Sequence, residues 1–267
     1  MADPRFQILS DLHVESPNAY DIFHIEPKAP YLVLAGDIGY VKDDGFFNFL
    51  RKQLKTFRLV LLVMGNHEPY HSTWPEAKAR IKQFQVDLVS CKESETLGQF
   101  ILLDKTRYDI SPTVSVLGCT LFSEVAQEQE ESISFGLNDF YHIGDWSVES
   151  HRESHRADLA WLNYEIDSIS RLEPERKVVL FTHYCPLTVK DVVDPKHKSS
   201  KISSGFMTDL SNERCWKCGV ISLWAFGHTH FNCDFRDSEY GTRVVSNQRG
   251  YYFAQATDFD STKVVGL

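Results

Sequence analysis

The chain has 267 residues, of which 42% are hydrophobic, 24% are charged and 13% are aromatic, a composition typical of a globular protein with a sizeable core. Its formal net charge of −9 disfavours extended binding along a nucleic-acid backbone, which needs clustered Lys and Arg. No apolar run reaches the roughly 18–20 residues that span a bilayer, so no membrane partner is expected.

The N-terminus and the cysteines bear on the cellular compartment. The first five residues, Met1–Arg5, lack the basic-then-apolar pattern of a secretory signal. The six cysteines are scattered, without the density of a disulfide scaffold, and this favours reduced thiols. Both observations predict a cytoplasmic protein.

Three short apolar runs near the start of the chain predict buried strands: Arg5–Leu9, Tyr31–Ala35 and Leu59–Val63. Between the second and third runs, Asp43 and Asp44 are candidate N-caps of a helix. Apolar residues follow there at spacings of 4, 4 and 3, namely Phe46, Leu50, Leu54 and Phe57. Strand, helix and strand in this order form a βαβ unit, so we expect its two strands to be parallel.

The rest of the chain continues to alternate helices and strands. Two further helices are predicted, one after Ser72 and a long one that starts near Ser147 and closes at Pro174. Further strands are predicted at Phe100–Leu103, Val114–Phe122, Lys177–Phe181 and Ile221–Phe226, followed by a hairpin around residues 238–241. Because there is no internal repeat and no long linker, residues 1–267 are expected to form a single domain of the α/β class.

Five of the predicted strands are followed closely by residue types that bind metals. These residues are Asp11 and His13, Asp37, Asn66 with His67, His183, and His228 with His230. The carboxyl ends of parallel strands lie side by side in a twisted sheet, so side chains far apart in the sequence converge there. Glycines precede three of the groups, at positions 36, 65 and 227, where a turning backbone often needs no Cβ.

The candidate ligands are nitrogen and oxygen donors without sulfur, which suits Mn, Fe, Zn or a similar divalent ion. Even without His67, the seven remaining side chains are more than one ion normally takes in a protein, so two ions are expected. Two ions roughly 3.5–4 Å apart need a bridging group, and a carboxylate can bridge where an imidazole cannot. Asp37 is the expected bridge.

The motifs occur in a fixed order across almost the whole chain: Asp-Leu-His at 11–13, Gly-Asp at 36–37, Gly-Asn-His-Glu at 65–68, a strand-terminal His183, and Gly-His-Thr-His at 227–230. In these motifs the sequence resembles the calcineurin-like metallophosphoesterase superfamily. The resemblance implies a four-layer αββα sandwich of two mixed β-sheets flanked by helices. It also implies that Asp11, His13, Asp37 and His230 hold one ion, that Asp37, Asn66, His183 and His228 hold the other, and that His67 is the acid for the leaving oxygen.

Two departures from family patterns narrow the expected activity. Protein Ser/Thr phosphatases of the family carry Arg before Gly-Asn-His-Glu and an Asp-Arg-Gly stretch after the second motif, whereas this chain has Met64 and Gly39–Lys42 there. Gly36–Tyr40 matches a motif of purple acid phosphatases, in which the tyrosine binds metal. Those enzymes lack the histidine that His13 supplies here, so Tyr40 is expected to pack beside the site.

The favoured function is therefore a phosphodiesterase in which a metal-activated hydroxide attacks a small phosphate ester, such as a cyclic nucleotide. One alternative is a phosphomonoesterase, including a phosphoprotein phosphatase. The other is a metal-binding scaffold without activity. The sequence leaves the native metals, the physiological substrate and the oligomeric state open.

Four other features lie outside these motifs. His151 and His155, four residues apart on the long helix, are expected on a solvated face. Cys215 and Cys218 form a lone C-x-x-C, for which no zinc site is expected. The aromatic segment 135–146 is expected to pack locally, with stacking on a nucleobase as the alternative. The polar segment 191–206 is expected to be a surface loop, with a phosphate-attracting lid as the alternative.

Overall fold

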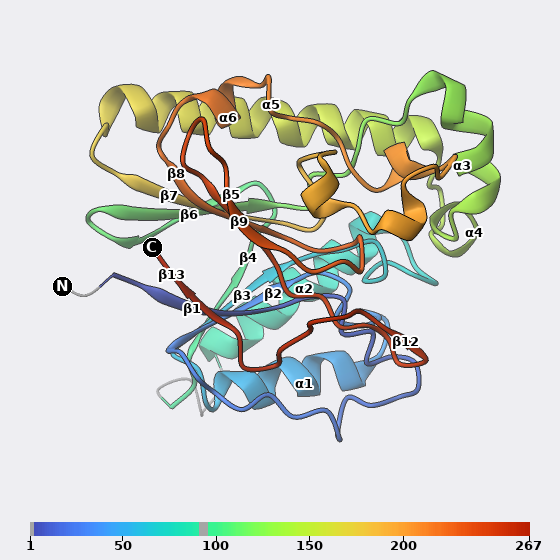
Figure 1. Cartoon of the computed structure of the whole chain (residues 1–267). Coiled ribbons are helices and arrows are strands. Elements are labelled where there is room, and N and C mark those ends of the chain that lie inside the picture. Colours follow the sequence, from blue (N-terminus) through green and yellow to red (C-terminus); the bar gives the residue numbers. More distant parts are fainter. Residues whose placement is uncertain (1–2, 91–95) are drawn as a thin grey trace.

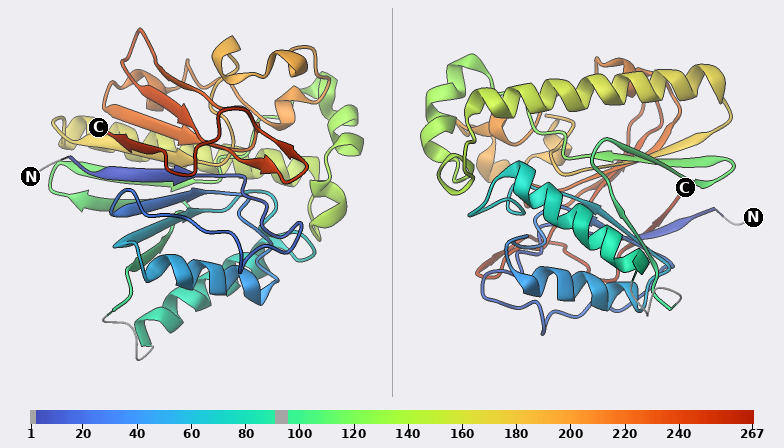
Figure 2. Two further views of the ribbon diagram at one scale, coloured as in Figure 1. Left: turned by 60° about the horizontal axis from the view of Figure 1, so that its bottom comes forward. Right: turned by 180° about the vertical axis from the view of Figure 1, so that it is seen from behind.

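The computed structural model describes residues 3–90 and 96–267, and its layers form a sandwich. Two large mixed sheets pack face to face, and helices cover the outer faces of both sheets (Figures 1 and 2). Helices α1 (Asp44–Leu54) and α2 (Trp74–Ser90) lie on one side, whereas α5 (Val148–Leu172) and the short α6 (Arg214–Lys217) lie on the other. The expected four-layer architecture is confirmed.

The first sheet has the strand order β13-β1-β2-β3-β4, in which β1 to β4 are parallel and β13 is antiparallel to β1. Its strands are β1 (Arg5–Leu9), β2 (Tyr31–Ala35), β3 (Leu59–Val63), β4 (Gln99–Leu102) and β13 (Val264–Gly266). The parallel pairing of β2 with β3 confirms the predicted βαβ unit, and it places the ends of β1, β2 and β3 along one edge.

The second sheet has the order β5-β6-β7-β8-β10-β9, with a parallel centre from β6 to β10 and antiparallel strands at both edges. Its strands are β5 (Thr106–Ser111), β6 (Val114–Cys119), β7 (Lys177–Thr182), β8 (Ile221–Phe226), β9 (Asp234–Arg236) and β10 (Arg243–Ser246). The β9–β10 pair is the predicted hairpin. A separate two-stranded hairpin follows, formed by β11 (Gly250–Tyr251) and β12 (Ala254–Gln255).

Strand β3 shows why an uninterrupted apolar run becomes a central strand. All five of its residues are buried. Leu59, Leu61 and Val63 belong to the core between the two sheets, whereas Val60 and Leu62 belong to the core beneath the helices. Since both faces of the strand are covered, every position must be apolar, and the alternation of apolar with polar residues is absent.

The helices follow the predicted periodicity, and Asp43 is the N-cap residue of α1 as predicted, although its side chain makes no capping hydrogen bond. The Ser147 hydroxyl accepts a hydrogen bond from the backbone N–H of Ser150 at the start of α5, and the helix ends at Leu172, two residues before Pro174. The buried face of α2, the helix predicted after Ser72, includes Ala77, Ile81, Phe84 and Leu88. Two shorter helices, α3 (Glu130–Gly136) and α4 (Asp139–His142), precede α5.

Three details differ from the sequence predictions. Strand β6 ends at Cys119 and not at Phe122, because Leu121 and Phe122 have φ angles of 75° and 51°, which a strand does not accommodate. Strand β5 has no apolar run and was not predicted. The expectation of a solvated face for His151 and His155 is wrong. Both are buried, and one ring nitrogen of each is hydrogen-bonded to the backbone of residues 121–123.

The structure bears on the predictions about membrane helices and cysteines, but only for the residues that it describes. No helix among the described residues is long and apolar enough to cross a membrane. The five described cysteines are free, as expected, and Cys91 lies outside the described residues. The single domain and the cytoplasmic location stay predictions.

Candidate metal centre

The loops at the carboxyl ends of five strands bring the predicted site residues together. Asp11 and His13 follow β1, Asp37 follows β2, Asn66 and His67 follow β3, His183 follows β7, and His228 and His230 follow β8. Among the described residues, two of the three groups whose ligand atoms all lie within 4.8 Å of one another consist of predicted ligands, and the third is His13 with Glu15 and His67. One group of predicted ligands contains Asp11, His13 and His230, and the other contains Asp37, His183 and His228.

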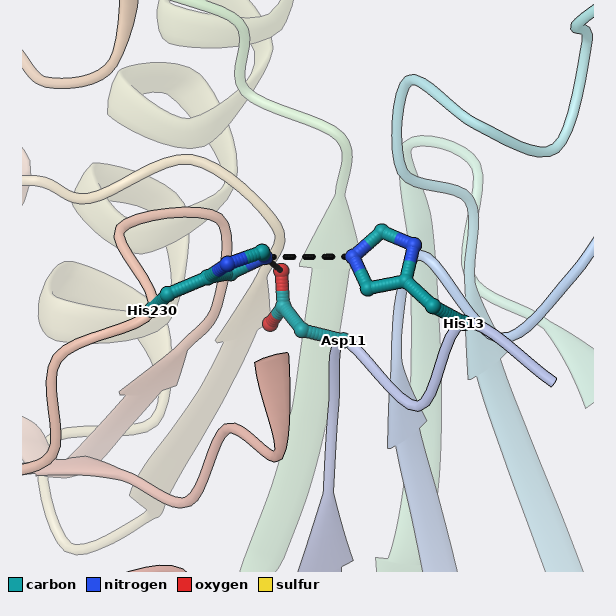
Figure 3. A group of neighbouring side chains, drawn as sticks. All are labelled: Asp11, His13 and His230. Atoms are coloured by element: carbon teal, nitrogen blue, oxygen red, sulfur yellow. Dashed lines mark hydrogen bonds and ion pairs between the residues drawn. The ribbon is translucent and has the colours of Figure 1, made fainter. Parts of the chain in front are cut away.

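In the first group, two histidine ring nitrogens face each other. His13 Nε2 lies 3.1 Å from His230 Nε2, and His230 Nε2 lies 3.3 Å from Asp11 Oδ1, so the three side chains face one another (Figure 3). Asp11 comes from the first sheet and His230 from the second, so this group spans both sheets.

Asp37 lies between the two groups. Its Oδ1 is 3.5 Å from His183 Nε2, and its Oδ2 is 3.9 Å from His13 Nε2. Asn66 adds an amide oxygen to the second group, since its Oδ1 lies 3.1 Å from the same His183 nitrogen. The Asp37 carboxylate therefore presents one oxygen to each group.

Backbone strain is concentrated at these residues. Five of the seven predicted ligands have φ between 45° and 70°, a region that side chains other than glycine rarely adopt: Asp11, His13, Asp37, His228 and His230. Each lies where the chain turns sharply at the end of a strand, so the turns direct several side chains into one small volume.

Two different structural requirements explain why glycine stands next to the ligands. Gly36 has a φ of 92°, so it supplies the left-handed turn that the sequence predicts. The φ of Gly65 lies outside the left-handed region, but a Cβ there would collide with the Asp37 carboxylate. Gly65 is therefore required for the close approach of two loops and not for its backbone conformation.

Burial and neighbouring charges set the protonation of the buried ligands. Burial alone would raise the pKa of the Asp37 carboxyl, but His183 and His67 hold it well below its usual value. Burial and the nearby His183 imidazole lower the pKa of His228 well below its usual value. An ionised carboxylate and a neutral imidazole are the forms that bind cations.

His67 lies beside the two groups and has its own partners. Its Nδ1 is 3.2 Å from Glu15 Oε1, and its Nε2 is 3.3 Å from the Tyr251 hydroxyl. The Tyr70 ring stacks on the imidazole with the ring centroids 4.2 Å apart. Burial lowers the pKa of His67, but Asp37 and Glu15 outweigh burial and raise it to about 9.

Glu68, the last residue of Gly-Asn-His-Glu, ties two of the loops together. Its buried carboxyl accepts hydrogen bonds from the backbone N–H groups of Asp37, Ile38 and Gly65 at 2.7–3.0 Å. Burial and the nearby Asp37 raise the pKa of Glu68 to about 7. No role was predicted for Glu68 from the sequence, although a third polar residue in a motif that needs only two ligating or catalytic ones was a usable signal.

Three more residues outside the predicted set contact it. Glu15 bonds the Nδ1 atoms of His13 and His67, Asp139 accepts a hydrogen bond from Asn66, and the Tyr251 ring lies 4.3 Å from His13. Glu15 was identifiable from its i, i+2 spacing after His13. Asp139 and Tyr251 follow no predicted strand, so nothing in the sequence pattern marks them.

A cavity of about 400 Å³ opens beside the site. Asp37, Asn66, His67, His228 and His230 form the part of its wall that belongs to the site. Further lining residues come from the two segments singled out in the sequence, 135–146 and 191–206, from Met207 next to the second segment, and from the β11–β12 hairpin region. Three short 3-10 turns lie within the second segment or at its start: Lys190–Val192, Pro195–His197 and Ser203–Gly205.

The remaining candidates lie apart from the ligand groups. The Tyr40 ring lies 6.2 Å from the His67 ring and 5.9 Å from the Tyr70 ring, so it packs beside the site. Cys215 is buried and Cys218 is half-buried. Within the part of the chain that the structure describes, no group of three or more clustered candidate ligands includes a cysteine.

Comparisons with known proteins show the family and the fold of the chain. The model of the calcineurin-like phosphoesterase family matches residues 4–232. A protein of Acanthamoeba polyphaga mimivirus, named as uncharacterised, is 28% identical over 262 residues, which are 91% of this chain and 90% of that protein.

Two solved structures share the fold. Phosphopantetheinyl hydrolase from Mycobacterium tuberculosis has a TM-score of 0.61 at 17% identity, with 94% of this chain and 90% of that chain covered. A dimetal phosphatase from Danio rerio has a TM-score of 0.52 at 13% identity, with 92% and 87% covered. From the extent of the family match, the chain belongs to the calcineurin-like phosphoesterase family, whose members are metal-dependent phosphoric ester hydrolases.

Proposed function

We propose that this protein is a dinuclear metal-dependent phosphoesterase that hydrolyses a small phosphodiester. One cation would be held by Asp11, His13, Asp37 and His230, and the other by Asp37, Asn66, His183 and His228. The observation that carries the proposal is the position of Asp37, whose two carboxylate oxygens each face one group of nitrogen ligands.

The residues of the site fit divalent cations. His228 Nε2 is buried and has no hydrogen-bond partner, which is costly for a polar atom unless a ligand satisfies it. The donor set combines imidazole nitrogens with carboxylate and amide oxygens and contains no thiolate, which suits Mn, Fe or Zn. Divalent cations in such a site make hydroxide available near neutral pH and stabilise negative charge on a phosphoryl group.

His67 is proposed as the general acid. A carboxylate can only accept hydrogen bonds, so Glu15 holds the proton of the imidazole on Nδ1 and leaves Nε2 for the substrate. Nε2 lies beside the Tyr251 hydroxyl, and both residues line the cavity. From this position the protonated imidazole donates to the departing alkoxide, a step that contributes roughly 10²–10⁴ in rate.

The cavity supports a diester over a monoester. A monoester dianion carries a charge near −2 and is typically held by the paired N–H groups of arginine. Among the described residues that line the cavity there is no arginine, and Lys196 is its one lysine. Its volume of about 400 Å³ lies within the range of roughly 300–1,000 Å³ for small-molecule sites, which accommodates a nucleotide-sized diester such as a cyclic nucleotide.

Assays with bis-p-nitrophenyl phosphate and p-nitrophenyl phosphate in Mn²⁺ test the proposal. We expect faster turnover of the diester, and a panel of 2′,3′- and 3′,5′-cyclic nucleotides then identifies the preferred class. Faster turnover of the monoester would favour a phosphomonoesterase. Turnover of neither substrate would favour a metal-binding scaffold.

The His67→Ala variant tests the catalytic role separately. It should lose roughly 10²–10⁴ in kcat on alkyl diesters while it keeps the metal content of the wild type. His24→Ala, which changes an exposed histidine outside the site, is the matched control and should keep full activity. Loss of metal from His67→Ala would show that its role is wrongly assigned.

A further inference from the structure

Asp139 is a buried carboxylate that accepts hydrogen bonds from three side chains of the site. Its Oδ1 accepts from Asn66 Nδ2 at 2.7 Å and from the Tyr70 hydroxyl at 2.6 Å, and its Oδ2 accepts from the Tyr184 hydroxyl at 3.5 Å. The residue is 2% exposed and begins the short helix α4. It is not among the seven proposed ligands, so its role depends on the three side chains that donate hydrogen bonds to it.

The bond from Asn66 fixes which end of its amide faces the site. An amide has an oxygen on one side and an NH₂ group on the other, and only the oxygen can bind a cation. Because Nδ2 donates to Asp139, Oδ1 faces the opposite way, where it lies 3.1 Å from His183 Nε2. A carboxylate ligand such as Asp37 presents an oxygen in either orientation, so Asn66 is the proposed ligand that needs such a restraint.

The two tyrosines connect the same carboxylate to other residues of the site. The Tyr70 ring stacks on His67 with centroids 4.2 Å apart, and the Tyr184 ring lies 4.1 Å from the His228 ring. Both hydroxyls donate hydrogen bonds to Asp139, and these bonds restrain the positions of the two rings. All three donors are neutral groups, so the carboxylate is not part of a salt bridge with them.

We propose that Asp139 is a positioning residue that presents the Asn66 carbonyl oxygen to the second cation, an inference that rests on the proposed function. Residues that orient metal ligands in this way typically contribute 10–100-fold to metal affinity. This role depends on the direction of the hydrogen bond between the two side chains: an acceptor at position 139 requires a donor at position 66.

Exchanging donor and acceptor tests the proposal. Mn²⁺ binding to the metal-free full chain is measured by titration calorimetry and elemental analysis for the wild type, Asp139→Asn, Asn66→Asp and the double variant. Asp139→Asn should weaken the second Mn²⁺ by about 10-fold, because its amide no longer dictates the orientation of Asn66. Asn66→Asp should also weaken it, because two carboxylates then meet at hydrogen-bond distance.

The double variant should bind the second Mn²⁺ more tightly than Asn66→Asp alone, since the new amide at position 139 donates to the new carboxylate. The same Asp139→Asn change thus lowers affinity in one background and raises it in the other. A general structural role, or a role through charge alone, predicts weaker binding in both backgrounds, and that result would overturn the proposal.

Tyr70→Phe is the matched control, because it removes a hydrogen bond to the same Asp139 oxygen but leaves the amide of Asn66 held. It should keep the affinity for the second Mn²⁺ within about 3-fold, below the effect expected for a residue that orients a ligand. All of these variants keep side chains of nearly the same shape, and circular dichroism checks that each is folded. If the wild type itself binds fewer than two Mn²⁺, the proposed function fails, whatever the variants show.

Discussion

Glu15 joins two histidines that have different proposed roles. Its Oε1 lies 3.2 Å from Nδ1 of His13, a proposed ligand, and 3.2 Å from Nδ1 of His67, the proposed acid. Since a carboxylate only accepts, both imidazoles carry a proton on Nδ1 and direct Nε2 away from Glu15. One buried side chain thus sets the orientation of two rings.

Glu15→Gln is expected to lower kcat on bis-p-nitrophenyl phosphate by about 10–100-fold, with KM changed less than 3-fold. The amide is nearly isosteric but uncharged, so it stabilises the protonated His67 less and also offers an N–H to a ring nitrogen. Steady-state kinetics checks the prediction, and elemental analysis of the same sample separates a lost proton donor from a lost metal ligand. An unchanged kcat would show that His67 does not depend on this carboxylate.

The Tyr251 hydroxyl gives a second prediction at this scale. It lies 3.3 Å from His67 Nε2, and its ring lies 4.3 Å from the His13 ring, so the hydroxyl is placed where the leaving oxygen of a substrate would meet His67. Tyr251→Phe keeps the ring and removes one hydrogen bond of about 1–1.5 kcal/mol. We expect kcat/KM to fall by about 10-fold. Tyr252→Phe, next to it and exposed, is the control that should leave kcat/KM unchanged.

The residues that could be predicted from the sequence are those that end a strand. Asp37 and His183 follow uninterrupted apolar runs, so their positions at one edge of a sheet follow from the strand pattern alone. Asp139 and Tyr251 reach the site from a short helix and a two-stranded hairpin. Their roles depend on which side chains they meet across the fold, and no local pattern contains that information.

At the scale of elements, helix α5 supports the site through the segment that follows β6. His151 Nε2 accepts hydrogen bonds from the backbone N–H of Ser123 at 3.1 Å, and His155 Nδ1 lies 2.8 Å from the Leu121 carbonyl oxygen. The Thr120 carbonyl in turn accepts from the backbone N–H of His183 at 3.2 Å. The face of α5 that carries His151 and His155 is therefore buried because it holds the turn at Leu121 and Phe122, which adjoins the Thr120 carbonyl bonded to His183.

His151 predicts a pH dependence of stability. Burial and the neighbouring His155 lower the pKa of His151 to about 3, against an ordinary value of about 6.5 in the unfolded chain. Between these two values the unfolded chain binds a proton that the folded chain does not, so the free energy of unfolding falls as pH falls below about 6.5. From about pH 7.5 to about pH 5 the loss due to this residue is about 2 kcal/mol.

Urea unfolding of the metal-free protein at the two pH values checks this prediction. In His151→Gln the amide can still accept from Ser123 but cannot titrate, so the loss of stability on acidification should be smaller by about 2 kcal/mol than in the wild type. The proposed ligands titrate in both proteins and cancel in the comparison. Equal losses in the two proteins would contradict a neutral, buried His151.

The wrong predictions for α5 and for the end of β6 show where residue spacing fails to predict burial. The spacing of His151 and His155 marked one face of a helix, but histidine is polar and the pattern was interpreted as a solvated face. Burial of that face depends on a turn whose Leu121 and Phe122 have positive φ, and apolar residues in a run predict a strand there instead. One unrecognised turn therefore accounts for both errors.

At the scale of the whole molecule, the two sheets were each predictable in part, but their contact was not. Runs such as Leu59–Val63 indicate strands covered on both faces, yet they do not say which sheet lies opposite. The family resemblance supplied that pairing, and the core between the sheets confirms it. The proposed ligands lie on both sides of this contact, with Asp11 and Asp37 after strands of the first sheet and His183 and His228 after strands of the second.

Because the proposed ligands come from both sheets, we expect bound metal to stabilise the folded chain as well as to support activity. Asp11, Asp37 and Asp139 are buried carboxylates in one small region, and bound cations would complement their charge in the folded chain. Mn²⁺ that binds only the folded chain stabilises it by about 2.7 kcal/mol at a hundredfold excess over Kd. For a protein of this size the melting temperature should then rise by about 5–10 °C.

Thermal unfolding of the wild type with Mn²⁺ and with a chelator measures that shift, and Asp37→Asn supplies the discriminating comparison. The variant removes the carboxylate whose oxygens face both ligand groups, so its melting temperature should respond to Mn²⁺ by less than about 2 °C. An equal Mn²⁺ shift in both proteins would mean that the cations do not lie at Asp37, and that the two sheets are joined without them.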